Sequence, residues 1–215
     1  MSSLKVKCFT LGQLKTNCFV ITDKINNNCV VIDPGEDPEP VLRYIKDKTV
    51  DYILLTHSHH DHIAGLNEIR KMTGGLVAIH HEEAQWLLEP NLNLSYQSKN
   101  PIVCNWPDIV LYGGEVIKWN NHLIKSIHTP GHSPGGTCYL IEQYLFSGDT
   151  LMEGVIGITY GVPYGNREKL KQSIRNKLFT LEDGIKVMPG HGNLTSIGME
   201  KRYNLLPNVK SFSRD

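Results

Sequence analysis

The feature that most constrains this chain is a cluster of metal-binding residue types directly behind a short apolar run. Ile53-Leu54-Leu55 leads into Thr56-His57-Ser58-His59-His60-Asp61-His62. If a strand ends at Leu55, the cluster lies on a loop at the edge of a sheet, where open α/β sheets usually carry their sites. Imidazole is the commonest metal ligand in proteins, and a carboxylate is its usual companion. The stretch therefore predicts a metal site rather than a solvated loop rich in histidine.

The spacing within this cluster indicates two metal ions. His57 and His59 are two residues apart, so in an extended loop both side chains can face one point. Asp61 and His62 follow where a helix would begin, and they can face a second point nearby. Two ions need further ligands, and three more candidates follow apolar runs and stand beside glycine: His132 in Thr129-Pro130-Gly131-His132-Ser133, Asp149 in Phe146-Ser147-Gly148-Asp149-Thr150, and His191 in Pro189-Gly190-His191-Gly192.

Composition narrows the class of protein. The 215 residues suit a single domain, 1–215, that can bury a sizeable core. Lys plus Arg and Asp plus Glu both number 22, so no net field attracts nucleic acid or an anionic membrane. No run approaches the roughly 18 apolar residues of a membrane span, and the first residues lack the apolar core of a signal peptide. We expect a small-molecule substrate and leave open whether the chain is a monomer or a homodimer.

The cysteines indicate a reducing compartment. There are five of them, an odd number, and none forms a Cys-x-x-Cys pair, which argues against a disulfide framework or a zinc ribbon. Four stand in apolar, strand-like context and are expected to be buried free thiols. Because such usage fits a reducing environment, we expect a cytoplasmic protein.

Hydrophobic periodicity predicts strands and helices over most of the chain. Strands are expected at 4–9, 18–22, 28–33, 50–55, 76–79, 109–111, 115–119, 122–128, 136–142, 144–147 and 185–188. Helices are expected at 38–48, from Asp61 to the Gly74-Gly75 pair, and at 82–89, 167–180 and 197–206. A second half of the fold is expected to begin near Ile109.

Three features leave alternatives open. The loop 90–107 either borders a substrate mouth or is an ordinary surface excursion, since a loop of this length is usually functional or mobile. Asp33 either steadies the metal loop or only serves a turn. His80 and His81 are better explained by the start of a helix than by metal binding, because the acidic pair Glu82-Glu83 suits a first helical turn.

Segments beyond the ligands carry a resemblance to a known family: Thr16-Asn17-Cys18-Phe19-Val20-Ile21, Val31-Ile32-Asp33-Pro34-Gly35, and Pro189-Gly190-His191-Gly192-Asn193-Leu194-Thr195-Ser196-Ile197-Gly198. The chain resembles the glyoxalase II (hydroxyacylglutathione hydrolase) branch of the metallo-β-lactamase superfamily. The resemblance implies an α/β fold, a four-layer αββα sandwich of two mixed sheets flanked by helices, with the metals at the rim between the sheets. It looks like a short form without the C-terminal helical domain, and few basic residues remain near its end: Lys201, Arg202, Lys210 and Arg214.

The resemblance also implies a division of the ligands. The first metal would be held by His57, His59 and His132, the second by Asp61, His62 and His191, and Asp149 would bridge both. Zinc is the default for these two divalent ions, although nitrogen and oxygen donors also suit iron or manganese. Two ions about 3.5–4 Å apart can hold a water between them and make it a hydroxide near neutral pH. Asp61 would aim that hydroxide, while His60, between ligands, is expected to face away.

The substrate class follows from the leaving group. A thiolate leaves without protonation, and no general acid accompanies the ligands, so we expect hydrolysis of an activated acyl compound, most favourably a thioester of the hydroxyacylglutathione kind. In Gly157-Ile158-Thr159-Tyr160-Gly161, Tyr160 is a candidate oxyanion donor, but the arginine that short relatives carry there is missing, which argues against glutathione recognition. Alternatives are a lactone hydrolase and a persulfide dioxygenase with one iron. A β-lactamase is disfavoured because the chain shows no export signal.

Overall fold

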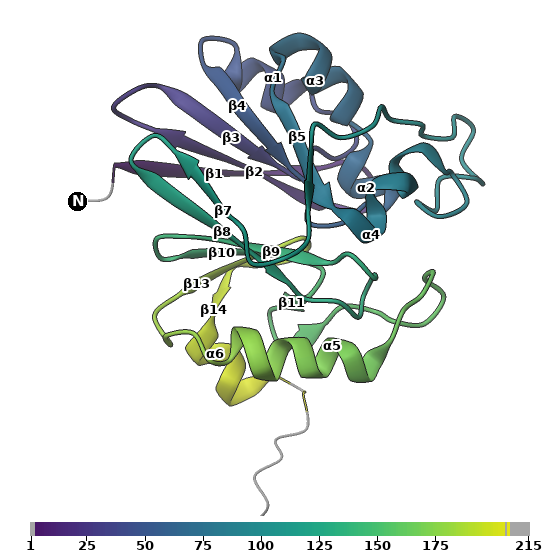
Figure 1. Ribbon diagram of the computed structural model, residues 1–215, viewed down its shortest axis with the longest axis vertical. Coiled ribbons are helices and arrows are strands. Elements are labelled where there is room, and N and C mark those ends of the chain that lie inside the picture. The colour runs from purple at the N-terminus through teal and green to yellow at the C-terminus, as the bar shows by residue number, and fades with distance from the viewer. Residues whose placement is uncertain (1–2, 205, 207–215) are drawn as a thin grey trace, which may run out of the picture.

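Two mixed sheets lie face to face at the centre of the molecule, and helices cover the outer face of each (Figure 1). The computed structural model describes residues 3–204 and 206. Two of the basic residues noted in the tail, Lys210 and Arg214, lie outside the described residues. Within that described part each sheet has six strands. This arrangement confirms the four-layer αββα sandwich.

The first sheet follows the order of the sequence: β1 (Leu4–Leu11), β2 (Thr16–Asp23), β3 (Asn28–Ile32), β4 (Thr49–Leu54), β5 (Leu76–His80) and β6 (Ile109–Leu111). The first three strands are antiparallel, and the strands from β3 to β6 are parallel. The parallel connections carry α1 (Glu39–Ile45), α2 (His60–Ile63), α3 (Leu66–Thr73) and α4 (His81–Ala84), the last continued by a 3₁₀ turn over Gln85–Leu88.

The second sheet has the order β14 (Thr195–Ser196), β13 (Lys186–Pro189), β10 (Tyr144–Gly148), β9 (Thr137–Ile141), β8 (His122–His128) and β7 (Val116–Trp119). Only β10 and β13 pair in parallel. Their connection contains a small ribbon, β11 (Leu151–Met152) and β12 (Val155–Ile156), and then α5 (Arg167–Ser173), which runs on into a π turn over Ile174–Leu178. The helix α6 (Ile197–Tyr203) follows β14.

Alternation along the strands builds three hydrophobic layers. In β2, Val20 faces the first helical layer while Phe19 faces the second sheet. In β10, Leu145 packs beneath α5, whereas Phe146 faces the first sheet. A shift of register by one residue would reverse both faces of a strand, so burial on both sides fixes the strand ends that carry the ligands.

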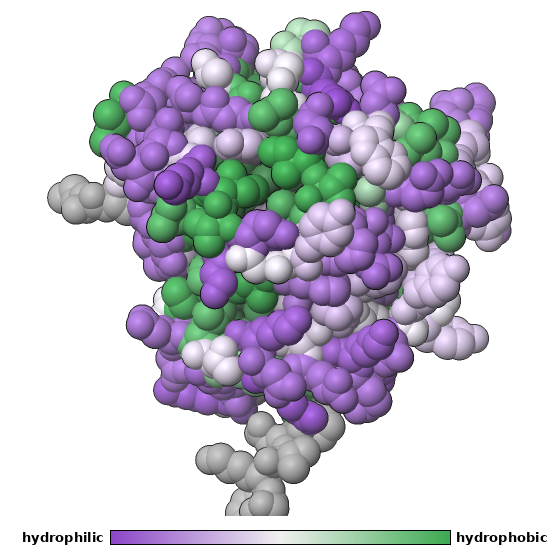
Figure 2. All heavy atoms as spheres, in the orientation of Figure 1, coloured by the Kyte–Doolittle hydropathy of each residue, from purple (hydrophilic) through white to green (hydrophobic). Residues whose placement is uncertain are grey.

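The outer helices present one apolar face to a sheet and a polar face outward. Leu170 is fully buried on α5, and the Asn166 side chain caps that helix by accepting a hydrogen bond from the Lys169 N–H at 2.9 Å. Hydrophilic side chains cover the outward face of α5, whereas apolar side chains gather over the sheets (Figure 2).

The helix expected from Asp61 onward is broken into two. The break lies at Gly65, whose N–H donates to the Pro34 carbonyl at 2.9 Å, and a side chain there would collide with the Gly35 carbonyl. Packing against this turn therefore ends α2 before α3 begins. The second helix ends at Gly74, with φ 71°, as expected.

Two further expectations about the elements are wrong. The strand at Ile109 does not open a second half, because β6 pairs in parallel with β5 and completes the first sheet. The last helix ends at Tyr203 rather than at 206. The strands β11, β12 and β14 were not expected, since two residues are too few to show a period.

All five cysteines are free thiols, and four of them are buried; Cys8, on β1, is exposed. Burial raises the pKa of the Cys29 thiol to about 12. Among the residues described, no helix has the length and apolar composition needed to cross a bilayer.

Candidate metal centre

The histidine-rich loop leaves the first sheet at the end of β4. Asp33, just after β3, accepts hydrogen bonds from the Thr56 N–H at 2.7 Å and from the Thr56 hydroxyl at 2.6 Å. Asp33 has φ 51°, a conformation that aspartate tolerates better than most residues. Of the two alternatives left open for Asp33, the structure thus supports the one in which its side chain steadies the metal loop.

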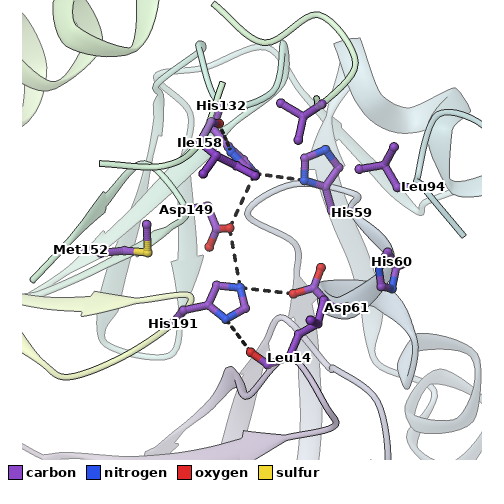
Figure 3. A pocket seen from close by; sticks show the side chains of 11 residues that line it. Leu14, His59, His60, Asp61, Leu94, His132, Asp149, Met152, Ile158 and His191 are labelled. Carbon is purple, nitrogen blue, oxygen red and sulfur yellow. Dashed lines mark hydrogen bonds and ion pairs between the residues drawn. The ribbon is translucent and has the colours of Figure 1, made fainter. Parts of the chain in front are cut away.

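The remaining candidate ligands come from the second sheet. His132 lies between β8 and β9, Asp149 directly follows β10, and His191 follows β13. Because β10 and β13 are parallel neighbours, their carboxyl ends deliver Asp149 and His191 to the same edge. The two sheets therefore contribute their ligands to one rim of the sandwich, where Figure 3 shows His132, Asp149 and His191 facing Asp61 and His59.

The glycines that precede these ligands leave no room for a side chain. A Cβ at Gly131 would overlap the backbone of α5, one at Gly148 would overlap the Thr56 side chain, and one at Gly190 would overlap the carboxylate of Asp149. The glycine that precedes each of these ligands in the sequence is therefore explained by sterics. Only glycine lets these loops approach each other closely enough.

All seven predicted ligands converge on this rim. Their donor atoms form three overlapping groups, in each of which the atoms lie within 4.8 Å of one another: His57, His59 and His132; His57, His62 and Asp149; Asp61, His62 and His191. The first and third groups are the two triads that the resemblance implied. Asp149 lies between them, with one carboxylate oxygen 3.5 Å from His62 Nε2 and the other 3.6 Å from His132 Nε2.

Four of the imidazoles hold their Nδ1 atoms against an acceptor at 2.7–3.1 Å: Asp33 Oδ2 for His62, the Ile158 carbonyl for His132, the Leu14 carbonyl for His191, and Thr56 Oγ1 for His57. An acceptor at Nδ1 keeps the proton on that nitrogen and turns the Nε2 lone pair toward the centre. Metal-binding histidines in proteins are oriented in this way. His59 differs, because its Nδ1 lies 2.9 Å from His132 Nε2.

The donor atoms are chemically ready to bind a metal. His57 Nε2 and Asp149 Oδ1 are buried and have no hydrogen-bond partner, which is costly unless a cation meets them. Burial, together with the neighbouring imidazoles, holds the pKa of His57 well below its usual range. Burial and the adjacent His132 lower the pKa of His59 to about 3. Both rings are therefore neutral at pH 7, the form in which imidazole binds metals.

The two carboxylates are anionic. Burial would raise the pKa of Asp61, but His62 and hydrogen bonds from His191 and Thr16 outweigh it and hold the pKa well below its usual range. Asp149 behaves alike, since His62 and His132 outweigh its burial. Two anions thus face the imidazoles at the rim.

Positive charge is favoured at His62. Burial opposes it, but Asp61, Asp149 and Asp33 outweigh burial and raise the pKa of this ring well above its usual value. Its Nε2 lies 3.4 Å from Asp61 Oδ2 and 3.3 Å from His191 Nε2. A divalent cation held by these three donors would supply that charge. The residues present therefore fit two metal ions, one in each triad.

Side chains of β2 position the second triad. Thr16 Oγ1 donates to Asp61 Oδ2 at 2.7 Å. Asn17 Nδ2 donates to the Pro189 carbonyl at 3.1 Å and to the Gly192 carbonyl at 2.9 Å, so it holds both ends of the turn that presents His191. These two residues belong to a segment that the family resemblance singled out, but their role became visible only in the structure.

Glu83 is a positioning residue that the sequence analysis missed. It is fully buried on α4 and accepts hydrogen bonds from the Ser58 N–H at 2.7 Å, the Ser58 hydroxyl at 2.8 Å and the Gly135 N–H at 2.8 Å. Burial raises its pKa, although these hydrogen bonds oppose the shift. Glu83 thereby ties the loop of His57 to the loop of His132. In the sequence, nothing distinguishes it from the acid beside it.

A cavity of about 420 Å³ opens over the centre (Figure 3). Metal ligands form one side of it, and apolar side chains form most of the rest: Leu14, Leu94, Met152, Ile158 and Val162. Because Leu94 belongs to the loop 90–107, that loop borders the site, which was one of its two alternatives. His60 also lines the cavity, so the expectation that it faces away is wrong.

Tyr160 lies apart from the centre. Its side chain is 95% exposed, and it is not among the residues that line the cavity, although Ile158 and Val162 on either side of it are. Its role as an oxyanion donor stays a prediction.

The histidines outside the cluster also lie away from the centre. His80 accepts a hydrogen bond from the Glu82 N–H at 3.4 Å, so it caps α4 as expected for the start of a helix. Its ring stacks on that of His128, with 3.8 Å between centroids. His122, on β8, lies 3.0 Å from a carboxylate oxygen of Glu142. None of these three is in a group that could hold a metal.

An αββα sandwich whose rim gathers histidine and aspartate donors from both sheets defines the class of metallo-hydrolases. Residues 11–191 match the family model described as the metallo-beta-lactamase superfamily, so the chain belongs to that superfamily.

Relatives cover almost the whole chain. The "Probable metallo-hydrolase YqgX" of Bacillus subtilis is 35% identical over 98% of this chain and 100% of its own length. The "Hydroxyacylglutathione hydrolase GloC" of Haemophilus influenzae is 32% identical over 97% and 100%. Among solved structures, the BLEG-1 B3 metallo-beta-lactamase has a TM-score of 0.89 and 35% identity, covering 94% of this chain and 98% of that one.

Proposed function

We propose that this metallo-hydrolase cleaves an activated acyl compound, most favourably a thioester. The observation that carries the proposal is the convergence of seven histidine and aspartate donors beneath an apolar cavity, with four imidazoles that hold an acceptor against Nδ1 and turn Nε2 toward the centre. Zinc, iron and manganese all suit a shell of nitrogen and oxygen donors, and we propose zinc as the default.

Two bound divalent ions would supply a nucleophilic hydroxide near neutral pH and a Lewis acid for the substrate carbonyl. The chain itself orients the attack. Thr16 holds one oxygen of Asp61 at 2.7 Å, so the carboxylate keeps a fixed direction along the cavity wall and can accept a hydrogen bond from the attacking water. Ile158 and Met152 form part of the apolar wall, so a bound acyl group packed against them would displace water and strengthen the polar contacts beneath it.

The leaving group sets the substrate class. Among the residues lining the cavity, His60 is the only side chain that can carry a proton and is not itself a proposed ligand. An amine leaving group needs such a proton, whereas a thiol, with a pKa of about 8.5, leaves as the anion. A thioester needs no proton donor, whereas a peptide would depend on His60 alone, so we propose a thioester. The relative described as a hydroxyacylglutathione hydrolase supports the same class.

The structure offers no basic clamp for a glutathione carboxylate at the cavity. Within the described residues, no lysine or arginine lines it. Lys201, near the end of the chain, is bound instead to the Leu181 carbonyl at 2.8 Å and to Asp183 at 2.7 Å. We therefore propose thioester hydrolysis without proposing glutathione as the thiol carrier.

A second candidate is ring opening of a β-lactam, favoured by the similarity to the BLEG-1 enzyme. A strained cyclic amide is activated much as a thioester is, so the same site could attack it.

The test is a substrate panel. Protein loaded with zinc, iron or manganese, and chelated protein as a control, is assayed with acyl thioesters, lactones, a chromogenic β-lactam, and a glutathione persulfide with an oxygen electrode. We expect hydrolysis of thioesters by loaded protein only. Turnover of lactones or of the β-lactam without thioester turnover would refute the substrate class, and oxygen uptake with the persulfide would refute hydrolysis.

A further inference from the structure

A second hollow adjoins the metal cavity. It has a volume of about 470 Å³ and shares Leu14, His60 and Asp61 with the metal cavity. Because Asp61 is a proposed ligand and belongs to both walls, the two hollows meet at the reacting centre. A substrate whose carbonyl lies at the metals would then extend into one hollow on each side.

The two hollows differ in chemistry. Beyond the ligands and His60, the metal cavity is walled by aliphatic side chains and Met152. The second hollow, called the polar hollow below, carries five polar side chains that the metal cavity lacks, Gln13, Glu36, Ser95, Ser98 and Asn100, beside the apolar Ala64 and Ile102. An apolar acyl chain fits the first, and a carrier with hydrogen-bonding groups fits the second. This assigns the acyl group to the metal cavity and the leaving thiol to the polar hollow.

The polar hollow is built from fixed backbone. On one side, Glu36 Oε2 accepts a hydrogen bond from the Gln13 N–H at 3.2 Å. On the other, the buried Asn93 anchors the loop 90–107, because its Nδ2 donates to the Trp86 and Ile102 carbonyls at 3.1 and 3.0 Å, and its carbonyl accepts from the His60 N–H at 2.8 Å. Both walls of the hollow therefore have a fixed position relative to α2, the helix that carries Asp61 and His62.

Charge in the polar hollow has one sign. Glu36 is exposed and contributes a carboxylate, and in the described part of the chain no lysine or arginine lines this hollow. The only other carboxylate there, Asp61, faces the proposed metals. A carrier that brought a carboxylate beside Glu36 would meet like charge, which is unfavourable, whereas an ammonium or neutral amide would not.

We propose that the polar hollow is the leaving-group subsite and that Glu36 makes it select thiol carriers with a neutral or positively charged end over carriers with an anionic end. This inference rests on the proposed hydrolysis of thioesters and names the class of carrier for that same site.

The test uses metal-loaded full-length protein and three thioesters with one acyl group. The thiols are cysteamine, which is cationic, N-acetylcysteamine, which is neutral, and 3-mercaptopropionate, which is anionic. We expect the lowest KM for the cationic ester and the highest for the anionic one, with a difference that shrinks as salt is raised. Glu36→Gln should narrow the cationic-to-anionic ratio of kcat/KM roughly twofold to fivefold, the range of exposed ion pairs.

Glu39→Gln is the matched control. Glu39 is an exposed acid on α1 that lies 3.6 Å from Arg43 and does not line the hollow. As a second measurement, isothermal titration with non-hydrolysable thioether analogues of the three esters reports binding without turnover, and the same order of affinity is expected.

The outcomes separate this inference from the proposed function. If loaded protein hydrolyses the neutral ester but prefers the anionic one, or if Glu36→Gln and Glu39→Gln change the ratio equally, the carrier selection is overturned and thioester hydrolysis stands. If none of the three esters is hydrolysed while another class in the substrate panel is, both fall together.

Discussion

Replacing Asp33 by asparagine should weaken metal binding without unfolding the protein. Asp33 Oδ2 lies 3.0 Å from His62 Nδ1, and the Thr56 hydroxyl and N–H donate to this carboxylate at 2.6 and 2.7 Å. An asparagine amide can accept on one side only, so its NH₂ group must face either Thr56 or the ring of His62. Facing the ring, it would drive the imidazole proton to Nε2 and block the lone pair that faces the centre.

The expected magnitude is a loss of 10- to 100-fold in affinity, the usual effect of removing a partner that orients a metal-binding histidine, or about 1.4–2.8 kcal/mol. The loss should fall mainly on the triad that contains His62. Competition against a chromophoric chelator, titrated to resolve two successive ions, measures both affinities in Asp33→Asn and in the wild type.

The control for this variant is Asp23→Asn. Asp23 is equally buried and also receives three hydrogen bonds, from the Ile25 N–H at 2.9 Å and from the side chains of Asn26 at 2.8 Å and Asn120 at 3.0 Å. It lies at the end of β2, opposite the end that reaches the rim, so urea unfolding should report a similar loss of stability with unchanged metal affinity. Wild-type affinity for both ions in Asp33→Asn, or an equal loss in both variants, would refute the orienting role.

Three further outcomes follow. Gly190→Ala should abolish metal loading, measured as ions per chain, because its Cβ overlaps Asp149, whereas Gly184→Ala, which meets no atom within 4 Å, should load normally. Tyr160→Phe tests the predicted oxyanion donor: a fall in kcat larger than the loss of stability would support that role, whereas an unchanged kcat, which the 95% exposure of Tyr160 favours, would remove it from the mechanism. Burial and His128 lower the pKa of His80 from the ordinary 6.5 to about 4. The unfolded chain therefore binds the proton first, and the free energy of unfolding falls as the pH drops from 6.5 to 4. Urea unfolding of metal-free His80→Gln should show a shallower fall over this range than the wild type, and an equal fall in both proteins would contradict the reasoning.

The fold could be predicted where one strand or helix carries its own signal. Apolar runs such as Ile53-Leu54-Leu55 marked strands, and Gly74 marked a helix end, because these signals are local. The break at Gly65 could not be seen, since its cause is contact with the turn at Pro34 and Gly35, about thirty residues away in sequence. The sheet to which β6 belongs likewise depends on pairing rather than on composition.

The ligands could be predicted because metals require particular residue types and strands deliver them at one edge. His132, Asp149 and His191 are isolated in the sequence, but each follows an apolar run and a glycine. The structure shows that close packing leaves room only for glycine at these positions. Glu83 could not be predicted, since its partners Ser58 and Gly135 lie 25 and 52 residues away and only the fold brings them together. The exposure of Tyr160 depends on the course of a loop, which no periodicity records.

Each triad draws members from both sheets: His57 and His59 meet His132 across the interface, and Asp61 and His62 meet His191. Neither half of the sandwich, taken alone, contains a full set of donors for either ion. Binding of cations therefore requires that the two sheets have packed together. A folding intermediate in which only one sheet has formed would not bind them. Ions bound in both triads would link the two sheets. The free energy of unfolding would then rise with the free ion concentration, as mass action requires.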